Sequence, residues 1–240
     1  MTHLLKTEHA ALSEIDSQIQ ILQYLINTSG IILSPEKSAQ LTEYTRLIIR
    51  RGTRSNLISQ KDLSRIAERH IFESLLLTKA ADFTGKIRIL DMGAGAGFPG
   101  LPLKIWNPEI ELCIIESVNK KCRFIEYVIE SLHLDSITLR SRRIEEAMKE
   151  TELLGMFDIV TARALAPLRD LFSLAEPFLR HDGTSRGMCV FPKGEHVREE
   201  IEQTDRTKWD ISVGDFTHFL AEHERKTRNL FVVSSLLTIT

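Results

Sequence analysis

The segment that decides the fold is IRILDMGAGAGFPGLPLKIW, residues 87–106. It opens as a short apolar strand, reaches an acid at Asp91 and continues into an apolar helical pattern. Between the two lie four glycines within eight residues, which are Gly93, Gly95, Gly97 and Gly100. Because so many glycines cost more backbone entropy than a plain connector justifies, we expect a ligand to approach the backbone closely at this turn.

From residue 86 onward, expected strands and helices alternate, which predicts a parallel sheet covered on both faces. The last two expected strands, 209–216 and 229–239, have no helix between them, so we expect them to pair antiparallel at one edge. The predicted fold class is α/β, a Rossmann-like, doubly wound and mostly parallel seven-stranded sheet over residues 83–240. The remaining expected strands are 87–90, 110–116, 136–141, 157–162 and 187–192, with helices at 100–106, 118–132, 144–150, 168–179 and 195–204.

A helical cap is predicted ahead of the sheet, over residues 1–82. Apolar residues at spacings of three, four and seven indicate a helix over 3–28. Pro35 begins a second helix, at the first helical position where proline is favoured. After an expected loop at 50–59, a third helix is expected from about 61 to 80.

The composition is that of an ordinary globular protein, with 42% hydrophobic and 27% charged residues. No apolar run reaches the roughly 18 residues of a membrane span, and the N-terminus has no apolar signal core, so no membrane partner is expected. An odd count of three cysteines without framework spacing favours a reducing, cytoplasmic setting. The eight histidines show no metal-type spacing, so no metal site is expected.

Positive charge is concentrated in one stretch, although the net charge of −2 argues mildly against a general nucleic-acid binder. Residues 46–69 contain seven basic side chains against two acids, Asp62 and Glu68. A solvated helical face is one interpretation, and an anionic partner such as a phosphate backbone is the other. The basic residues are Arg46, Arg50, Arg51, Arg54, Lys61, Arg65 and Arg69.

Two phosphate-binding motifs also contain glycine-rich turns of this kind. A P-loop needs Lys-Ser/Thr after the last glycine, whereas Gly100 is followed by leucine and proline. The dinucleotide pattern G-x-G-x-x-G is satisfied, and Glu116 ends the next strand where a ribose-binding acid belongs. Against a dinucleotide, Asp91 would repel a pyrophosphate, and Pro99 and Pro102 remove backbone N–H donors from the turn.

A cofactor with an ammonium group and no phosphate suits these charges better, and S-adenosylmethionine is such a molecule. Asp91 is expected to favour its ammonium group, and Glu116 to accept hydrogen bonds from its ribose hydroxyls. The glycine backbone would pass beneath the ribose and carboxylate. The sheet is therefore predicted to be an S-adenosylmethionine-dependent methyltransferase fold.

Motifs that the sequence lacks limit which atom is expected to accept the methyl group. The Asn/Asp-Pro-Pro-aromatic turn that accompanies methylation of exocyclic amines is replaced by TARALAP. Methylation of pyrimidine C5 needs a cysteine nucleophile, but Cys113, Cys122 and Cys189 occupy structural positions in strands or a helix. No firm catalytic residue or general base is evident, which suits N7 of guanine, whose lone pair is already free.

The sequence resembles the RsmG (GidB) family of bacterial methyltransferases that act on guanine N7 of 16S ribosomal RNA. The resemblance is carried by LDMGAGAGFPGLPLKIWNPEIELCIIES, SRRIEE, FDIVTARALAPL and FPKGE, with SNLIS and ERHIFESL upstream, and covers roughly residues 20–240. It implies cofactor contacts at Gly93, Phe98, Ile144, Glu145 and Arg163, the last of which is also a possible catalytic residue. It leaves open whether Glu145 is only a helix N-terminal acid.

The expected partner is 16S ribosomal RNA or the small ribosomal subunit, bound by a monomeric chain. The candidate RNA contacts are Arg50, Arg51, Arg54, Arg69, Arg143 and Lys193. Two features depart from the family pattern: NLI at residues 56–58 and a longer segment at 147–156. A methyltransferase of another acceptor, an NAD-dependent oxidoreductase and a non-catalytic binding module stay as alternatives.

Overall fold

The structure, a computed structural model, describes residues 2–55, 57–181, 186–220, 225 and 229–237. The side chains of residues 2–11, 53–55, 60, 236 and 237 lie outside the description. Within the described residues, no helix is both long and apolar enough to cross a membrane.

Seven strands form one sheet in the order β3-β2-β1-β4-β5-β7-β6 among the described residues. The first five strands in this order are parallel to one another, while β7 pairs antiparallel with both β5 and β6. The predicted α/β class and the antiparallel pairing of the last two strands are confirmed. The strands are β1 (Arg88–Met92), β2 (Glu111–Glu116), β3 (Ile137–Ser141), β4 (Ile159–Ala162), β5 (Met188–Lys193), β6 (Trp209–Asp215) and β7 (Phe231–Leu237).

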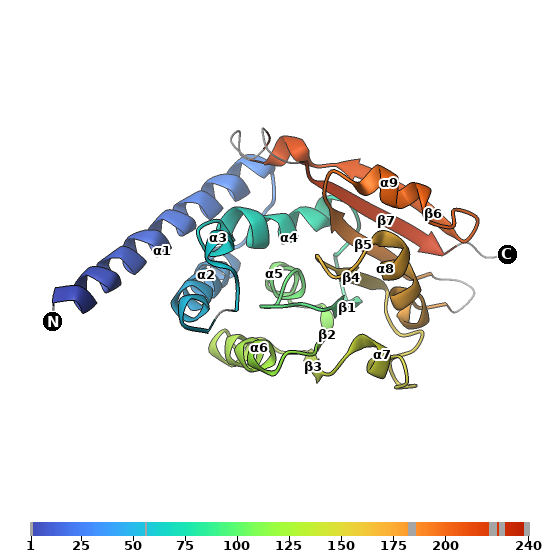
Figure 1. The fold of residues 1–240 in the computed structure, drawn as a ribbon, viewed down its shortest axis with the longest axis horizontal. Helices are drawn as coiled ribbons and strands as arrows, with labels where there is room; N and C mark the ends of the chain where they lie inside the picture. The colour runs from blue at the N-terminus through green and yellow to red at the C-terminus, as the bar shows by residue number, and fades with distance from the viewer. Residues whose placement is uncertain (1, 56, 182–185, 221–224, 226–228, 238–240) are drawn as a thin grey trace.

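Helices cover both faces of the sheet (Figure 1). One face carries α4 (Glu73–Leu76), α5 (Gly100–Trp106) and α6 (Asn119–Ser131). The other carries α7 (Ile144–Ala147), α8 (Leu168–Ala175) and α9 (Val197–Glu202). Strand β1 lies in the middle, and its residues 89–92 are buried, as expected for a central parallel strand. Short 3-10 turns lie at 77–79, 176–178 and 217–219.

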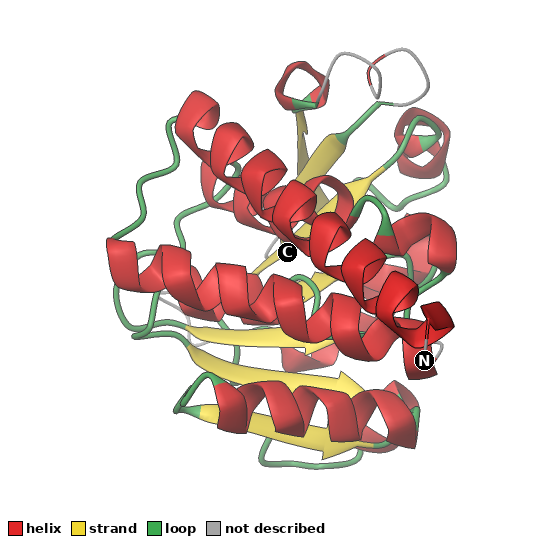
Figure 2. Cartoon of the chain, turned by 90° about the vertical axis from the view of Figure 1, so that its left-hand side faces the viewer, coloured by secondary structure: helices red, strands yellow, loops and turns green. Residues whose placement is uncertain are grey.

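The cap begins with two long helices, α1 (Thr2–Ser29) and α2 (Pro35–Ser55), and α1 crosses α2 obliquely (Figure 2). Helix α2 begins at Pro35 as predicted but continues to Ser55, so the loop expected from residue 50 was placed too early. Gly52 lies within this helix, and a Cβ added there would lie 2.7 Å from Leu63 Cδ2. The glycine therefore permits close packing between α2 and α3 (Gln60–Leu63).

The third predicted helix, from about 61 to 80, is not one regular helix. Helix α3 is followed by a π-helical turn at 67–72, then α4 and a 3-10 turn. A π turn inside a helix adds a residue to one turn and changes the direction in which the following side chains point. In this segment the irregular stretch contains His70 and leads directly to Glu73, two side chains that reach the candidate site.

The cap and the sheet share a hydrophobic core. A continuous cluster of buried side chains runs from Leu22 and Leu41 in the cap to Leu101 in α5 and Ile114 in β2. Hydrogen bonds also cross this boundary: Tyr44 Oη donates to the Ala96 carbonyl at 2.7 Å, and the Gln40 amide donates to the Leu132 carbonyl at 3.2 Å. The cap is thus fixed onto the glycine turn.

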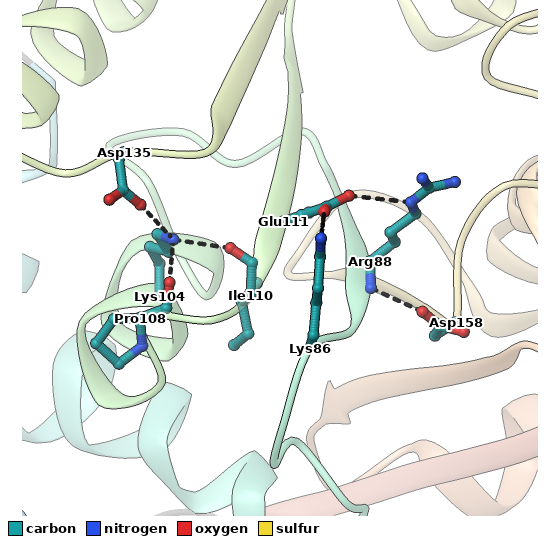
Figure 3. A network of polar contacts seen from close by, with 8 residues as sticks. All are labelled: Lys86, Arg88, Lys104, Pro108, Ile110, Glu111, Asp135 and Asp158. Carbon is teal, nitrogen blue, oxygen red and sulfur yellow. Dashed lines mark hydrogen bonds and ion pairs between the residues drawn. The ribbon is translucent and has the colours of Figure 1, made fainter.

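The amino ends of the central strands are tied together by polar contacts (Figure 3). The Lys104 ammonium, in a side chain only 2% exposed, donates to the carbonyls of Pro108 and Ile110 and pairs with Asp135. Glu111 forms ion pairs with both Lys86 and Arg88. These contacts stabilise the amino ends of β1 and β2, opposite the edge at which the carboxyl ends of the strands lie.

Replacing Lys104 with methionine leaves the Ile110 carbonyl without its buried donor. We expect Lys104→Met to lower the free energy of unfolding by about 1–3 kcal/mol, measured by denaturant titration. Lys86→Met, which removes an exposed ion pair from the same network, should change it by less than about 0.5 kcal/mol. Equal effects of the two substitutions would contradict a structural role for the buried lysine.

Candidate functional site

The glycine turn connects the end of β1 to the start of α5, and its first residue is tied to β2 by a hydrogen bond from Gly93 N–H to the Ile115 carbonyl of 2.8 Å. Gly95 has a φ of +64°, and a Cβ added there would meet no atom within 4 Å. Gly97 has a φ of +105°, and a Cβ there would lie 2.9 Å from Tyr44 Oη. Gly95 therefore exposes its backbone to open space, whereas Gly97 permits close packing with the cap.

Asp91 lies beneath this turn and is fully buried. Its Oδ2 accepts a hydrogen bond of 2.7 Å from Gly100 N–H, while Oδ1 has no partner among the described residues. Burial raises the pKa of the Asp91 carboxyl to about 7; the Gly100 hydrogen bond opposes this rise, and the nearby Glu116 charge adds to it. That Asp91 favours an ammonium group stays a prediction; its side chain is buried and lines neither cavity along the turn.

Glu116 ends β2 on the opposite side of the turn, where sequence reasoning placed it. Its Oε2 accepts from Gly95 N–H and its Oε1 from Val118 N–H, both at 2.8 Å. The side chain is only 5% exposed but lines a cavity at the ends of β2 and β3. Each carboxylate oxygen has a second lone pair, so Glu116 is able to accept further hydrogen bonds from hydroxyl groups.

Three neighbouring cavities lie along the carboxyl ends of the strands, and Arg163 and Ala164 line all of them. The first, about 440 Å³, lies beside β2 and α7 and includes Glu116, Ile144 and Glu145. The second, about 300 Å³, lies between the glycine turn and the cap. The third, about 400 Å³, lies at the end of β5. Open α/β sheets bind ligands at this edge, outside the carboxyl ends of their strands.

Arg163 follows β4 and is held by the cap. Its Nη2 forms an ion pair with Glu73 Oε2 at 3.0 Å, and the Glu73 side chain is only 4% exposed. The following residue, Ala164, has a φ of +50°, an uncommon conformation for a non-glycine residue. Glu73 belongs to the ERHIFESL motif, but no local pattern gives it a role, since 90 residues separate it from Arg163.

The second cavity also involves Phe98, which the resemblance selected. The Phe98 ring is buried between Tyr44, at a centroid distance of 5.5 Å, and His70, at 5.0 Å. His70 and Asp62 line the same cavity from the cap, and neither was selected from the sequence as a site residue. The available signals were the basic segment 46–69 for Asp62, which entered only as a charge, and the ERHIFESL motif for His70.

The candidate RNA contacts differ in their surroundings. Arg50, Arg51 and Arg143 are exposed, and the Arg51 guanidinium lies 3.4 Å from the centre of the Tyr127 ring. Arg143 lines the first cavity. Arg69 is half-buried and lines none of the three cavities, and the side chain of Arg54 lies outside the described residues.

Lys193 does not extend into solvent as a surface lysine would, because its side chain is only 11% exposed. Its Nζ lies 2.6 Å from Glu200 Oε2, which also accepts a hydrogen bond from Leu168 N–H at the start of α8. Lys193 and Glu200 line the third cavity together. The ion pair holds the lysine at the cavity wall, next to the segment that follows β4.

The cysteines have the structural character that the sequence indicated. All three are buried and unbridged. Burial raises the pKa of the Cys113 thiol to about 11 and that of Cys189 well above its ordinary value, so neither is an activated nucleophile. No group of three or more histidines, cysteines or acids suited to a metal ion occurs in the part of the chain that the structure describes.

Solved structures share this fold, and a methyltransferase is among them. Geranyl diphosphate C-methyltransferase from Streptomyces coelicolor, solved with S-adenosyl-L-homocysteine, superposes with a TM-score of 0.53 at 14% identity, covering 75% of this chain and 85% of that one. A fibrillarin/Nop5p complex superposes with a TM-score of 0.51 at 14% identity, covering 65% and 74%. At these identities the likeness concerns the fold alone.

The particular family follows from closer relatives. Residues 37–230 match the GidB family, described as rRNA small subunit methyltransferase G, and the chain belongs to this family. The ribosomal RNA small subunit methyltransferase G of Geobacillus kaustophilus is 30% identical, over 87% of this chain and 92% of its own. The protein of the same description from Chloroflexus aggregans is 36% identical, over 74% and 72%.

The burial of Asp91 predicts a pH-dependent stability. Its carboxyl pKa rises from 3.8 to about 7 on folding, so between these values the folded chain holds a proton that the unfolded chain releases. The stability that this group contributes therefore falls as pH rises from about 4 to 7. Asn retains an acceptor for Gly100 N–H without titrating.

We expect the unfolding free energy of Asp91→Asn, relative to the unmodified chain, to increase by on the order of 2 kcal/mol between pH 5 and pH 8. Denaturant titrations at several pH values measure this difference. A difference that stays constant across the range would show that the folded protein keeps Asp91 ionised.

Proposed function

We propose that this protein transfers a methyl group from S-adenosylmethionine to N7 of a guanine in 16S ribosomal RNA. The observation that carries the proposal is the set of adjoining cavities around Arg163 at the carboxyl edge of a methyltransferase sheet. Family membership over residues 37–230 supports the choice of small-subunit ribosomal RNA as substrate. The three unbridged cysteines suit the reducing cytoplasm, where this RNA is found.

The residues along the first two cavities fit the cofactor. Gly95 leaves open space that a side chain would fill, so its backbone is accessible to a ligand. Glu116 has lone pairs left for ribose hydroxyls, and Ile144 adds an apolar wall where the adenine would lie. When bound, the cofactor supplies an electrophilic methyl group on a sulfonium centre.

The contribution of the chain is then positioning and electrostatics. Guanine N7 carries a free lone pair, so no side chain has to remove a proton before this lone pair attacks the methyl group. We propose that the guanine base enters the third cavity, beyond Arg163. Arg163 and Lys193 border it, and both are held by buried or half-buried carboxylates, Glu73 and Glu200, which keeps them in place as the base binds.

The decisive experiment is transfer of labelled methyl groups from S-adenosylmethionine to purified small subunits, deproteinised 16S RNA and DNA, with RNA from a host lacking this protein. We expect label in RNA alone, with the modified position mapped by the strand cleavage that N7-methylguanine permits. Label at another base atom would replace the N7 assignment. Calorimetry with NADH and S-adenosylmethionine, run in parallel, separates this function from a dinucleotide enzyme.

The exposed arginines at the end of α2 are expected to bind phosphates. The double substitution Arg50→Gln/Arg51→Gln should weaken RNA binding and reduce the slope of log K against log salt by about 0.7–0.9 for each phosphate that is no longer neutralised. S-adenosylhomocysteine binding should stay unchanged. Filter binding across a salt series measures the slope, and Lys86→Gln, at the amino ends of the strands, is the matched control. An unchanged slope would remove this segment from the RNA interface.

A further inference from the structure

The cavity between the glycine turn and the cap has a charge pattern that the proposed function leaves unexplained. Its wall contains one carboxylate, Asp62, and two permanent cations, Lys121 and Arg163, among the residues that line it. An α-amino acid zwitterion needs both signs of charge within a small volume. The amino-acid end of S-adenosylmethionine is such a group, and the glycine turn forms the opposite wall.

The acid expected to serve the ammonium group is not available to it. Asp91 is fully buried, its Oδ2 accepts from Gly100 N–H, and it does not line the cavity. Glu116 lines only the neighbouring cavity, where its remaining lone pairs are assigned to the ribose hydroxyls. The ammonium partner therefore has to come from outside the β1–α5 turn.

Asp62 is held in a fixed orientation. Ser59 Oγ donates to its Oδ2 at 2.6 Å, and Ser59 also caps α3 by accepting from Asp62 N–H at 3.1 Å. His70 Nε2 lies 4.0 Å from the other oxygen, Oδ1, and the His70 ring contacts Phe98. The carboxylate is 35% exposed, so it remains able to accept from a ligand.

We propose that Asp62 accepts hydrogen bonds from the α-ammonium group of S-adenosylmethionine, so that the helical cap completes the cofactor site. Ser59 and His70 act as positioning residues for this carboxylate. The proposal rests on the proposed function for the identity of the cofactor. It gives the cap a role in cofactor binding beyond RNA contact.

Two ligands that differ at the amino-acid end test this role by calorimetry on the full chain. S-adenosylhomocysteine carries the ammonium group, whereas 5′-methylthioadenosine lacks the whole amino-acid portion. Asp62→Asn should weaken S-adenosylhomocysteine binding by about 10–150-fold, the value of a charged hydrogen bond, and leave methylthioadenosine binding unchanged. Asp16→Asn, an exposed acid on α1 that lines none of the three cavities, should affect neither ligand.

Ser59→Ala keeps the charge but releases the carboxylate, so it should cause a smaller loss of the same selective kind, even if Asp62→Asn folds poorly. Equal losses for both ligands, or no loss for either, would overturn the assignment. Since no RNA enters this measurement, selective loss without methyl transfer to RNA would keep Asp62 as the ammonium partner and reject the RNA substrate. A chain that binds neither ligand would reject both proposals.

Discussion

The hydrogen bond from Gly100 N–H to the buried Asp91 carboxylate is the contact on which the site depends. It joins the end of β1 to the first turn of α5, so the glycines between them must fold back into a tight loop. Glu116 holds the same loop from the other side through Gly95 N–H. Two carboxylates thus shape the turn from within, at the cost of burying one of them with a raised pKa.

The cap completes this arrangement rather than adding a separate layer. Tyr44 donates a hydrogen bond to the glycine turn, and Glu73 orients Arg163. Asp62 and His70 line the second cavity, between the glycine turn and the cap. These contacts require cap and sheet to share one hydrophobic core, as the continuous buried cluster shows. A change in the packing of the cap is therefore felt directly at the ligand-binding edge of the sheet.

The two ends of the sheet have opposite characters. At the amino ends, Lys104 and Glu111 pair with their neighbours through buried and exposed polar contacts. At the carboxyl ends, Gly95 of the glycine turn faces open space. Parallel topology produces this asymmetry, because the five parallel strands have their carboxyl ends at the same edge. In sheet order these strands are β3, β2, β1, β4 and β5.

Local pattern alone determined the alternating strands and helices, the antiparallel final pair and the position of the glycine turn, because periodicity and glycine content are properties of neighbouring residues. It also located Glu116 at the end of a strand, whereas the family resemblance selected Ile144 and Arg163. Tertiary structure decided the rest. Asp91 is buried and accepts a hydrogen bond from Gly100 N–H, and the third cap helix is irregular where it packs against α1 and α5. Asp62 and Glu73 joined the site across long chain separations. The direction of a side chain depends on which distant residues pack against it, which no local pattern contains.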